Sequence, residues 1–254
     1  MSPLPHSASP SAAGVMQTTP STFTPPLSGT PGAPLSAART AAELHRFTCD
    51  GPERMRPVEP GPGRLLLVRH GETLWSRDGR HTGLTDLPLT DAGRRRATGL
   101  PTLLGAHRIV HVRSSPLQRA AETLHLAGRT PDTYDADLAE WDYGAEEGRT
   151  TAEARRDGRP GWTVFDGVPP GDTPGETVEM VAARASRVLG RVWGHLEHGD
   201  VLLVGHGHHL RVLAAVYLRQ TPYLADSLEF EAGSLCVLGH HRDTPTIQQW
   251  NRMP

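Results

Sequence analysis

From residue 64 to the end of the chain, short aliphatic runs alternate with stretches of helical periodicity, and this alternation restricts the fold more than any other feature. A run without polar interruptions is typical of a strand buried on both faces of a parallel sheet, whose neighbours are usually connected by a helix. We therefore predict an α/β fold: a single three-layer domain with a mainly parallel central sheet and helices on both faces. The expected strands are 64–68, 109–113, 134–138, 201–205, 234–239 and 246–250.

The expected helices are 90–101, 116–127, 176–196 and 210–218. The hydroxyl of Thr90 can cap the first turn of the first helix. Pro101 is expected to end or kink that helix, because its ring excludes the helix interior. The helix over 176–196 has the clearest pattern, since its apolar residues recur on one face, and Gly199 is well placed to terminate it.

The beginning of the chain has a different composition. Residues 1–63 hold 12 of the 23 prolines, and the first 38 residues contain no Asp, Glu, Lys or Arg. Such a segment buries too little apolar surface to offset the entropy of ordering it. We predict that 1–60 is a disordered tail rich in Pro, Ser, Thr and Ala, and that 61–254 is the one folded domain; Met55 offers an alternative start.

Composition excludes several classes of function. All 26 basic residues are arginine, so Schiff-base chemistry and a Walker A loop, which both need a lysine, are ruled out. A net charge of −2 argues against a nucleic-acid partner. The two cysteines, Cys49 and Cys236, form no disulfide framework, and no aliphatic run is long enough to span a bilayer. These features favour a cytoplasmic protein without a membrane partner.

Two histidines follow predicted strands directly, and each is followed by glycine. His70 comes after the run Leu-Leu-Leu-Val-Arg, and His206 after Val-Leu-Leu-Val-Gly. Ligands of open α/β sheets bind at the carboxyl ends of the strands, and glycine lets backbone N–H groups approach a ligand closely. We therefore predict a functional site around His70 and His206.

At these residues the sequence resembles the histidine phosphatase superfamily, the phosphoglycerate mutase-like proteins. The resemblance extends from Arg64 to about Tyr223 and covers none of the tail. The matching strings are Arg69-His70-Gly71-Glu72-Thr73, Thr82-Gly83 with Pro88-Leu89-Thr90, Ser114-Ser115-Pro116-Leu117-Gln118-Arg119-Ala120, Glu140 with Gly144, Glu147 and Gly148, Pro174-Gly175-Glu176-Thr177, and Gly205-His206-Gly207.

The resemblance implies a phosphoryl transfer through a phosphohistidine. His70 matches the nucleophile, and Arg69, Arg119 and His206 match the phosphate pocket. Fixed cations suit this chemistry, because the transition state spreads negative charge over the equatorial oxygens. Glu140 matches the group that protonates the leaving oxygen and then deprotonates the attacking water.

The resemblance also assigns residues to the rest of the substrate pocket. They are Ser76 and Thr82 through their hydroxyls, Gly83 through its backbone N–H, Tyr143, Gly207 and His208. Trp75 is expected to pack against the wall of the pocket.

Other groups compete for these roles. Glu72 is the main rival to Glu140 as the acid, followed by Asp142, Glu146 and Glu147. Glu176 opens the long helix, where a carboxylate is favourable in any protein, so we interpret it as structural. The string 206–209 could hold a metal, but zinc sites usually combine ligands from separated elements. We therefore expect a metal-independent enzyme without a cofactor.

The resemblance favours a phosphomonoester hydrolase that acts on a small phosphorylated metabolite, a sugar phosphate or sugar bisphosphate. Cofactor-dependent mutases of the family carry an insertion with a lysine and adjacent arginines after the acid. Here only 25 residues separate Gly148 from Pro174, no lysine exists, and the pair Arg155-Arg156 is interpreted as a solvated helix face. A phosphoglycerate mutase-type phosphotransferase is the alternative, and a catalytically silent binding module for a phosphorylated ligand is the alternative from another class. A homo-oligomer is compatible with the sequence.

Overall fold

The computed structural model of the protein describes residues 63–254. The predicted tail over 1–60 and Cys49 lie outside the described residues. The division into a tail over 1–60 and a folded domain over 61–254 therefore stays a prediction.

The described chain contains the following helices and strands in sequence order: β1 (Leu65–Arg69), α1 (Leu74–Arg77), α2 (Asp91–Ala97), α3 (Leu100–Leu104), β2 (Ile109–Ser114), α4 (Gln118–Leu126), β3 (Thr133–Tyr134), α5 (Thr151–Arg156), α6 (Val178–Val192), β4 (Asp200–Gly205), α7 (Gly207–Tyr217), β5 (Leu235–His241) and β6 (Thr244–Arg252). Short 3-10 helices lie between them: η2 (Ala136–Leu138), η3 (Gly144–Glu146), η4 (Val164–Asp166), η5 (Trp193–Glu197) and η6 (Pro222–Ser227).

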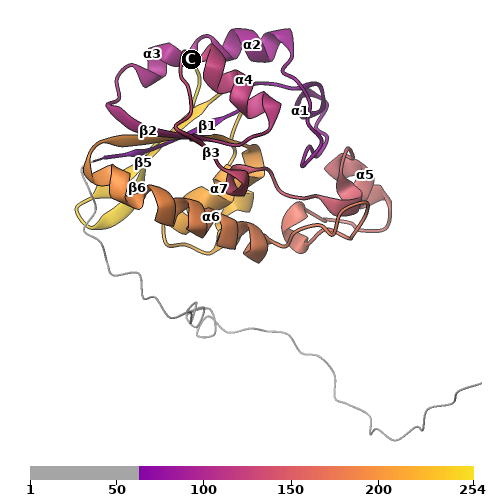
Figure 1. Ribbon diagram of the computed structural model, residues 1–254. Coiled ribbons are helices and arrows are strands. Elements are labelled where there is room, and N and C mark those ends of the chain that lie inside the picture. The colour runs from indigo at the N-terminus through magenta and orange to yellow at the C-terminus, as the bar shows by residue number, and fades with distance from the viewer. Residues whose placement is uncertain (1–62) are drawn as a thin grey trace, which may run out of the picture. The chain divides into compact units, whose positions relative to one another are not determined.

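The strands form one sheet in the order β3-β2-β4-β1-β5-β6, seen edge-on in Figure 1. The first four strands in this order are parallel, whereas β5 and β6 are antiparallel to their neighbours. The two carboxyl ends that matter for the site are adjacent, because β1 pairs with β4 in the register Arg69 opposite Gly205. The mainly parallel sheet predicted from the aliphatic runs is confirmed.

Helices cover both faces of the sheet, as predicted. Figure 1 shows α2, α3 and α4 on one face and α6 and α7 on the other. The side chains of β1 alternate between the two layers: Leu66 and Val68 pack with α2–α4, whereas Leu65 and Leu67 pack with α6 and α7. Because successive strand residues point to opposite faces, a continuous aliphatic strand fills two cores at once.

Two boundaries differ from the prediction. The first helix ends at Ala97, and Pro101 lies in the first turn of α3 rather than at the end of α2. Proline fits there because an N–H in the first turn of a helix has no hydrogen-bond partner within the helix, so its absence costs nothing. The third strand stops at Tyr134, since the Asp135 carboxylate accepts from the Asp137 N–H and starts a 3-10 turn.

The long helix is also shorter than expected. Thr177 caps α6 at its amino end, and the chain tightens into a 3-10 helix from Trp193. Gly199 then adopts a φ of 156° before β4. In contrast, α7 begins at Gly207, earlier than expected and directly after His206.

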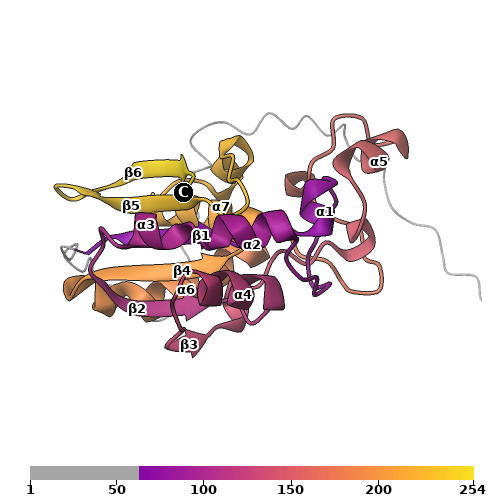
Figure 2. The ribbon, with the colours of Figure 1, turned by 90° about the horizontal axis from the view of Figure 1, so that it is seen from above.

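A side lobe without sheet structure lies beyond the carboxyl ends of the parallel strands. Figures 1 and 2 both show α1 and α5 together at this end of the sheet. An isolated bridge between Arg80 and Thr150 and the N–H of His81 on the Arg149 carbonyl, at 2.8 Å, connect them. A third apolar cluster, which includes Trp141, fills the lobe. The lobe therefore supplies one wall over the strand ends.

Within residues 63–254, no helix combines the length and the hydropathy of a bilayer span. Cys236 in β5 is buried and free. The cytoplasmic location stays a prediction.

Candidate active site

His70 lies in a tightly fixed loop between β1 and α1. Its N–H donates to the Gly205 carbonyl at the end of β4, at 2.9 Å, and the N–H of Gly71 donates to the Thr123 hydroxyl of α4, also at 2.9 Å. A Cβ at Gly71 would lie 2.7 Å from the Gly93 carbonyl oxygen, so only glycine allows α2 to approach the loop this closely. Three elements therefore hold the backbone of His70.

The ring of His70 is suited to nucleophilic attack. Its Nδ1 lies 2.7 Å from the Gly71 carbonyl oxygen. A carbonyl only accepts, so Nδ1 carries the proton and Nε2 keeps its lone pair. Burial lowers the pKa of His70 well below its usual value, and the charges of Arg119 and Arg69 lower it further. The imidazole is consequently neutral, which is the nucleophilic form.

Arg69 presents unused hydrogen-bond donors beside His70. One Nη1 hydrogen bond goes to the Phe230 carbonyl, while the buried Nε has no partner within the described residues. The guanidinium lies against the first residue of α7, where a Cβ at Gly207 would approach its Cζ to 3.2 Å. An unsatisfied buried donor on a permanent cation is unfavourable in the free protein and favourable once an anion binds.

His206, Arg119 and Ser115 form a buried chain of hydrogen bonds behind His70. The Arg119 Nε donates to His206 Nδ1 at 3.1 Å, and His206 Nε2 lies 2.7 Å from the Ser115 hydroxyl. The rings of His206 and His70 are 5.1 Å apart between centroids. The remaining Arg119 nitrogens donate to the carbonyls of Thr82, Gly83 and Thr85. In this arrangement Arg119 and His206 are fully buried next to His70 rather than facing open space.

Glu140 caps the amino end of α7 with its side chain. The N–H groups of His208 and His209 donate to its two carboxyl oxygens at 3.1 and 2.9 Å, and the N–H of Trp141 donates at 2.9 Å. These helix N–H groups have no partner inside the helix, and no other side chain caps α7. Glu140 as a whole residue is only 5% exposed, and it lines the cavity described next.

A cavity of about 350 Å³ opens at the carboxyl ends of β1 and β4. Eight of the eleven predicted site residues line it: Arg69, His70, Ser76, Thr82, Glu140, Tyr143, Gly207 and His208. Arg119, His206 and Gly83 do not contribute to the lining. Their assignment to the phosphate stays a prediction.

All three polar groups expected to contact phosphate already have partners within the protein. The Thr82 hydroxyl donates to the Arg80 carbonyl at 3.2 Å. The N–H of Gly83 donates to both oxygens of Glu147 at 3.0 Å, and the Ser76 hydroxyl closes a capping box with Thr73. Tyr143 has an internal partner too, because its hydroxyl lies 2.6 Å from His208 Nδ1. Burial raises the pKa of Tyr143 well above its usual value, so the phenol is neutral.

The rival acids have structural partners. The Glu72 carboxylate accepts the Thr90 hydroxyl at 2.6 Å, and Asp142 accepts the N–H groups of Gly144 and Gly175. Neither lines the cavity, whereas Glu140 and Asp226 do.

Several basic residues of the cavity were missed by the sequence analysis: Arg80, His81, Arg155 and Arg211. Arg211 lies one turn into α7, where its Nε donates to the Ala225 carbonyl at 2.7 Å and its guanidinium lies 5.7 Å from the Phe165 ring centre. Arg155 is exposed as expected, but it also lines the cavity, so its interpretation as a purely solvated residue was incomplete. The spacing of α5 gives no sign of this, because the contact depends on how the side lobe folds over the sheet.

Across residues 63–254, no group of three or more His, Cys, Asp or Glu side chains is arranged to hold a metal ion. The cations around the cavity are arginines, which carry a permanent positive charge. Metal independence stays a prediction, tested below.

Comparison with known proteins agrees with this geometry. An acid phosphatase of Mycobacterium tuberculosis is 43% identical over 152 residues, which cover 59% of this chain and 73% of that protein. Sedoheptulose 1,7-bisphosphatase of Saccharomyces cerevisiae is 33% identical over 184 residues, 61% of this chain and 67% of the relative. Proteins named phosphoglycerate mutase are also similar, such as one from Gloeobacter violaceus at 33% identity over 70% of this chain and 86% of the relative.

Solved structures share the fold as well. The product of an open reading frame of Mycobacterium tuberculosis superposes with a TM-score of 0.71 at 35% identity, over 76% of this chain and 98% of that one. A mycobacterial glucosyl-3-phosphoglycerate phosphatase in complex with VO3 superposes with a TM-score of 0.64 at 26% identity, over 75% and 99% of the two chains. Residues 65–253 match the sequence pattern of one family throughout. The chain belongs to the histidine phosphatase superfamily, branch 1.

Proposed function

We propose that this protein is a phosphoric monoester hydrolase that releases phosphate from small phosphorylated sugars through a phosphohistidine on His70. The observation that carries the proposal is the neutral ring of His70, whose Nδ1 is fixed on the Gly71 carbonyl while Nε2 keeps its lone pair, in the same cavity as Arg69 with its unpaired Nε. Family membership and relatives named phosphatases support the hydrolase class.

In the first step, the lone pair of His70 Nε2 attacks phosphorus. An N–P bond forms, the bond to the sugar oxygen breaks, and its electron pair leaves on that oxygen. The donors of Arg69 stabilise the charge on the phosphoryl oxygens. Protonated Glu140 gives its proton to the leaving oxygen, so the product is a neutral alcohol rather than an alkoxide.

In the second step, water attacks the phosphohistidine and the same carboxylate accepts its proton. The P–N electron pair returns to Nε2, which restores His70 and releases inorganic phosphate. Two smaller barriers replace one large barrier. A single carboxyl group serves both steps, because it is reset to its protonated form at the end of the cycle.

The composition of the cavity supports a substrate with a second anionic group. The cavity lining contains four arginines but only two carboxylates. The arginines are Arg69, Arg80, Arg155 and Arg211, and the carboxylates are those of Glu140 and Asp226. The Nε of Arg155 donates to the Trp162 carbonyl at 2.9 Å, which fixes the side chain, while its terminal nitrogens have no partner within residues 63–254. This set of cations would suit a sugar bisphosphate better than a monophosphate.

Replacing Arg155 by glutamine is expected to raise KM for fructose 1,6-bisphosphate about three- to tenfold, the loss of one charge-assisted contact at a partly exposed site. KM for fructose 6-phosphate should stay unchanged, because this substrate has no second phosphate to lose. Arg156→Gln is the matched control, since Arg156 is the exposed neighbour that does not line the cavity. Equal changes on both substrates would contradict a second anion site at Arg155.

The reaction class can be tested with phosphorylated sugars and glycerates, each assayed for phosphate release with and without EDTA. We expect release of inorganic phosphate that survives the chelator, because arginines provide the positive charge. Activity that is lost with EDTA and restored by zinc would support a metal site instead. Conversion of 3-phosphoglycerate to 2-phosphoglycerate without phosphate release would identify a mutase, and absence of both reactions would indicate a binding module.

A further inference from the structure

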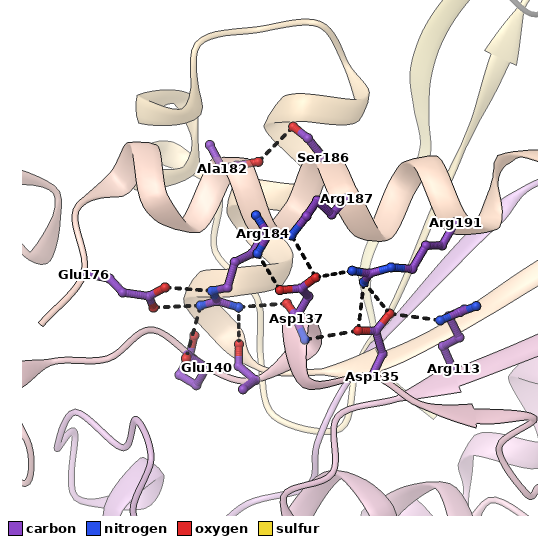
Figure 3. Close-up of polar contacts among 11 residues, drawn as sticks. Arg113, Asp135, Asp137, Glu140, Glu176, Ala182, Arg184, Ser186, Arg187 and Arg191 are labelled. Carbon is purple, nitrogen blue, oxygen red and sulfur yellow. Dashed lines mark hydrogen bonds and ion pairs between the residues drawn. The ribbon is translucent and has the colours of Figure 1, made fainter. Parts of the chain in front are cut away.

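The backbone that carries Glu140 is held by a side chain of the long helix, Arg184. Figure 3 shows its guanidinium between the carboxylate of Glu176 and the backbone of Glu140. Nη1 donates to the carbonyls of Asp137 and Ala139 at 2.8 and 3.0 Å, and Nη2 donates to the carbonyl of Glu140 itself at 3.3 Å. A single planar group therefore fixes three carbonyls within four consecutive residues.

Glu176 completes this contact from the other side. Its carboxylate binds Arg184 through two hydrogen bonds, at 2.7 Å to Nε and 2.8 Å to Nη2, and also accepts the N–H of Asp142 at 3.0 Å. The Glu176 carbonyl accepts the indole N–H of Trp141 at 2.8 Å. Residues on both sides of Glu140 are thus attached to one ion pair.

The position of Glu176 excludes a simpler explanation. Thr177, not Glu176, caps α6, since its hydroxyl oxygen accepts the N–H of Met180. The carboxylate of Glu176 is directed to Arg184 and Asp142 instead. The side chains of the ion pair are only 14% and 13% exposed, so water provides little replacement for the contacts. The interpretation of Glu176 as a helix-end carboxylate, suggested by the sequence, does not account for these contacts.

We propose that the Arg184–Glu176 pair positions the carboxyl group of Glu140 for proton transfer to the leaving oxygen; this inference rests on the proposed function. The carboxyl group is held by N–H groups of α7, and its backbone is held by the pair. Releasing the backbone lets the carboxyl group shift relative to the substrate. A displacement of about 1 Å can reduce a rate by about 10²-fold, even when it originates far from the reacting atoms. Arg184 does not line the cavity, so it acts through Glu140 and not on the substrate.

The decisive variant is Arg184→Gln, assayed by single-turnover phosphorylation of His70. With a sugar phosphate, whose leaving oxygen needs a proton, the rate should fall about 10- to 100-fold. With p-nitrophenyl phosphate, whose leaving group departs without a proton, it should fall less than about threefold. A general loss of folding would reduce both rates together, so their ratio reports on the position of the acid.

Arg187→Gln is the matched control on the same helix. Arg187 binds the carboxylate of Asp137 through Nε at 3.0 Å and Nη2 at 2.6 Å, but it touches no carbonyl of the segment, as Figure 3 shows. This variant removes a cation bound to the side chain of Asp137, whose carbonyl Arg184 binds, by the same substitution. Both rates should stay within about twofold of the parent, since Arg187 forms an exposed ion pair.

Arg184→Lys and Glu176→Gln provide a second measurement if Arg184→Gln fails to fold. Each of these variants keeps some of the hydrogen bonds that Arg184 and Glu176 form. The ratio of the rate with the sugar phosphate to the rate with p-nitrophenyl phosphate should therefore shift in the same direction as for Arg184→Gln, by a smaller factor. An unchanged ratio in a folded Arg184 variant would overturn the positioning role. A failure of the proposed function would look different. The parent protein itself would then form no phosphohistidine with either substrate.

Discussion

Replacement of His70 by alanine is expected to abolish turnover, with a loss of about 10⁴- to 10⁶-fold, as for nucleophile removal in other enzymes with covalent intermediates. In the proposed mechanism the ring supplies the lone pair that forms the N–P bond, and the neighbouring His206 is not available to replace it, since both of its nitrogens are engaged by Arg119 and Ser115. Rapid quenching of the parent with substrate should trap phosphate that is acid-labile and alkali-stable. The label should map to His70.

His125→Ala is a suitable control for this experiment, because His125 lies exposed in the last turn of α4. It should keep full turnover and label normally. Full activity of His70→Ala, or label on another residue, would end the phosphohistidine hypothesis.

Glu140→Gln should produce the second largest effect, and the effect should depend on the leaving group. Loss of a general acid costs about 10²- to 10⁴-fold when the leaving oxygen is basic, as in a sugar phosphate. Phosphorylation of His70 by p-nitrophenyl phosphate should be slowed far less, because p-nitrophenolate leaves without a proton. The glutamine carbonyl oxygen can still accept the N–H of His209, but its NH2 group would face the N–H of His208, so one of the two contacts to α7 is lost.

The measurement must use single-turnover phosphorylation, since the proposed mechanism also uses Glu140 as the base in the hydrolysis of phosphohistidine. Equal losses on both substrates would mean that Glu140 is not the acid. Asp226 would then be the next residue to test, because it is the other carboxylate that lines the cavity. Glu72 and Asp142, which the sequence suggested as rivals, are held by partners of their own outside the cavity.

Much of the fold was predictable because its determinants are local. The alternation of Leu65–Arg69 between two cores follows from strand geometry alone. Thr90 caps α2 as predicted, because a hydroxyl before a helical stretch meets the unpaired N–H groups of the first turn. The boundaries that failed are at Pro101, which lies in the first turn of α3, and after Tyr134, where the Asp135 carboxylate starts a 3-10 turn.

The site residues, too, were only partly predictable from local sequence. Arg69, His70 and Gly207 belong to short strings at strand ends, and the parallel pairing of β1 with β4 places these strings side by side. Gly83 belongs to a matching string between α1 and α2, yet its N–H is bound to Glu147, so a matching string does not guarantee a free donor.

The sequence by itself therefore determined the layered α/β architecture and the family, because aliphatic periodicity and short motifs act over a few neighbouring residues; the same motifs predict the nucleophile. Only the tertiary structure decided which cations line the cavity and what holds the proposed acid. Arg80, Arg155 and Arg211 come from separate parts of the chain, and Arg184 reaches the carbonyl of Glu140 across 44 positions of sequence. The physical reason is that a guanidinium on a long side chain finds its partners through the packing of whole elements, and no local pattern records that packing.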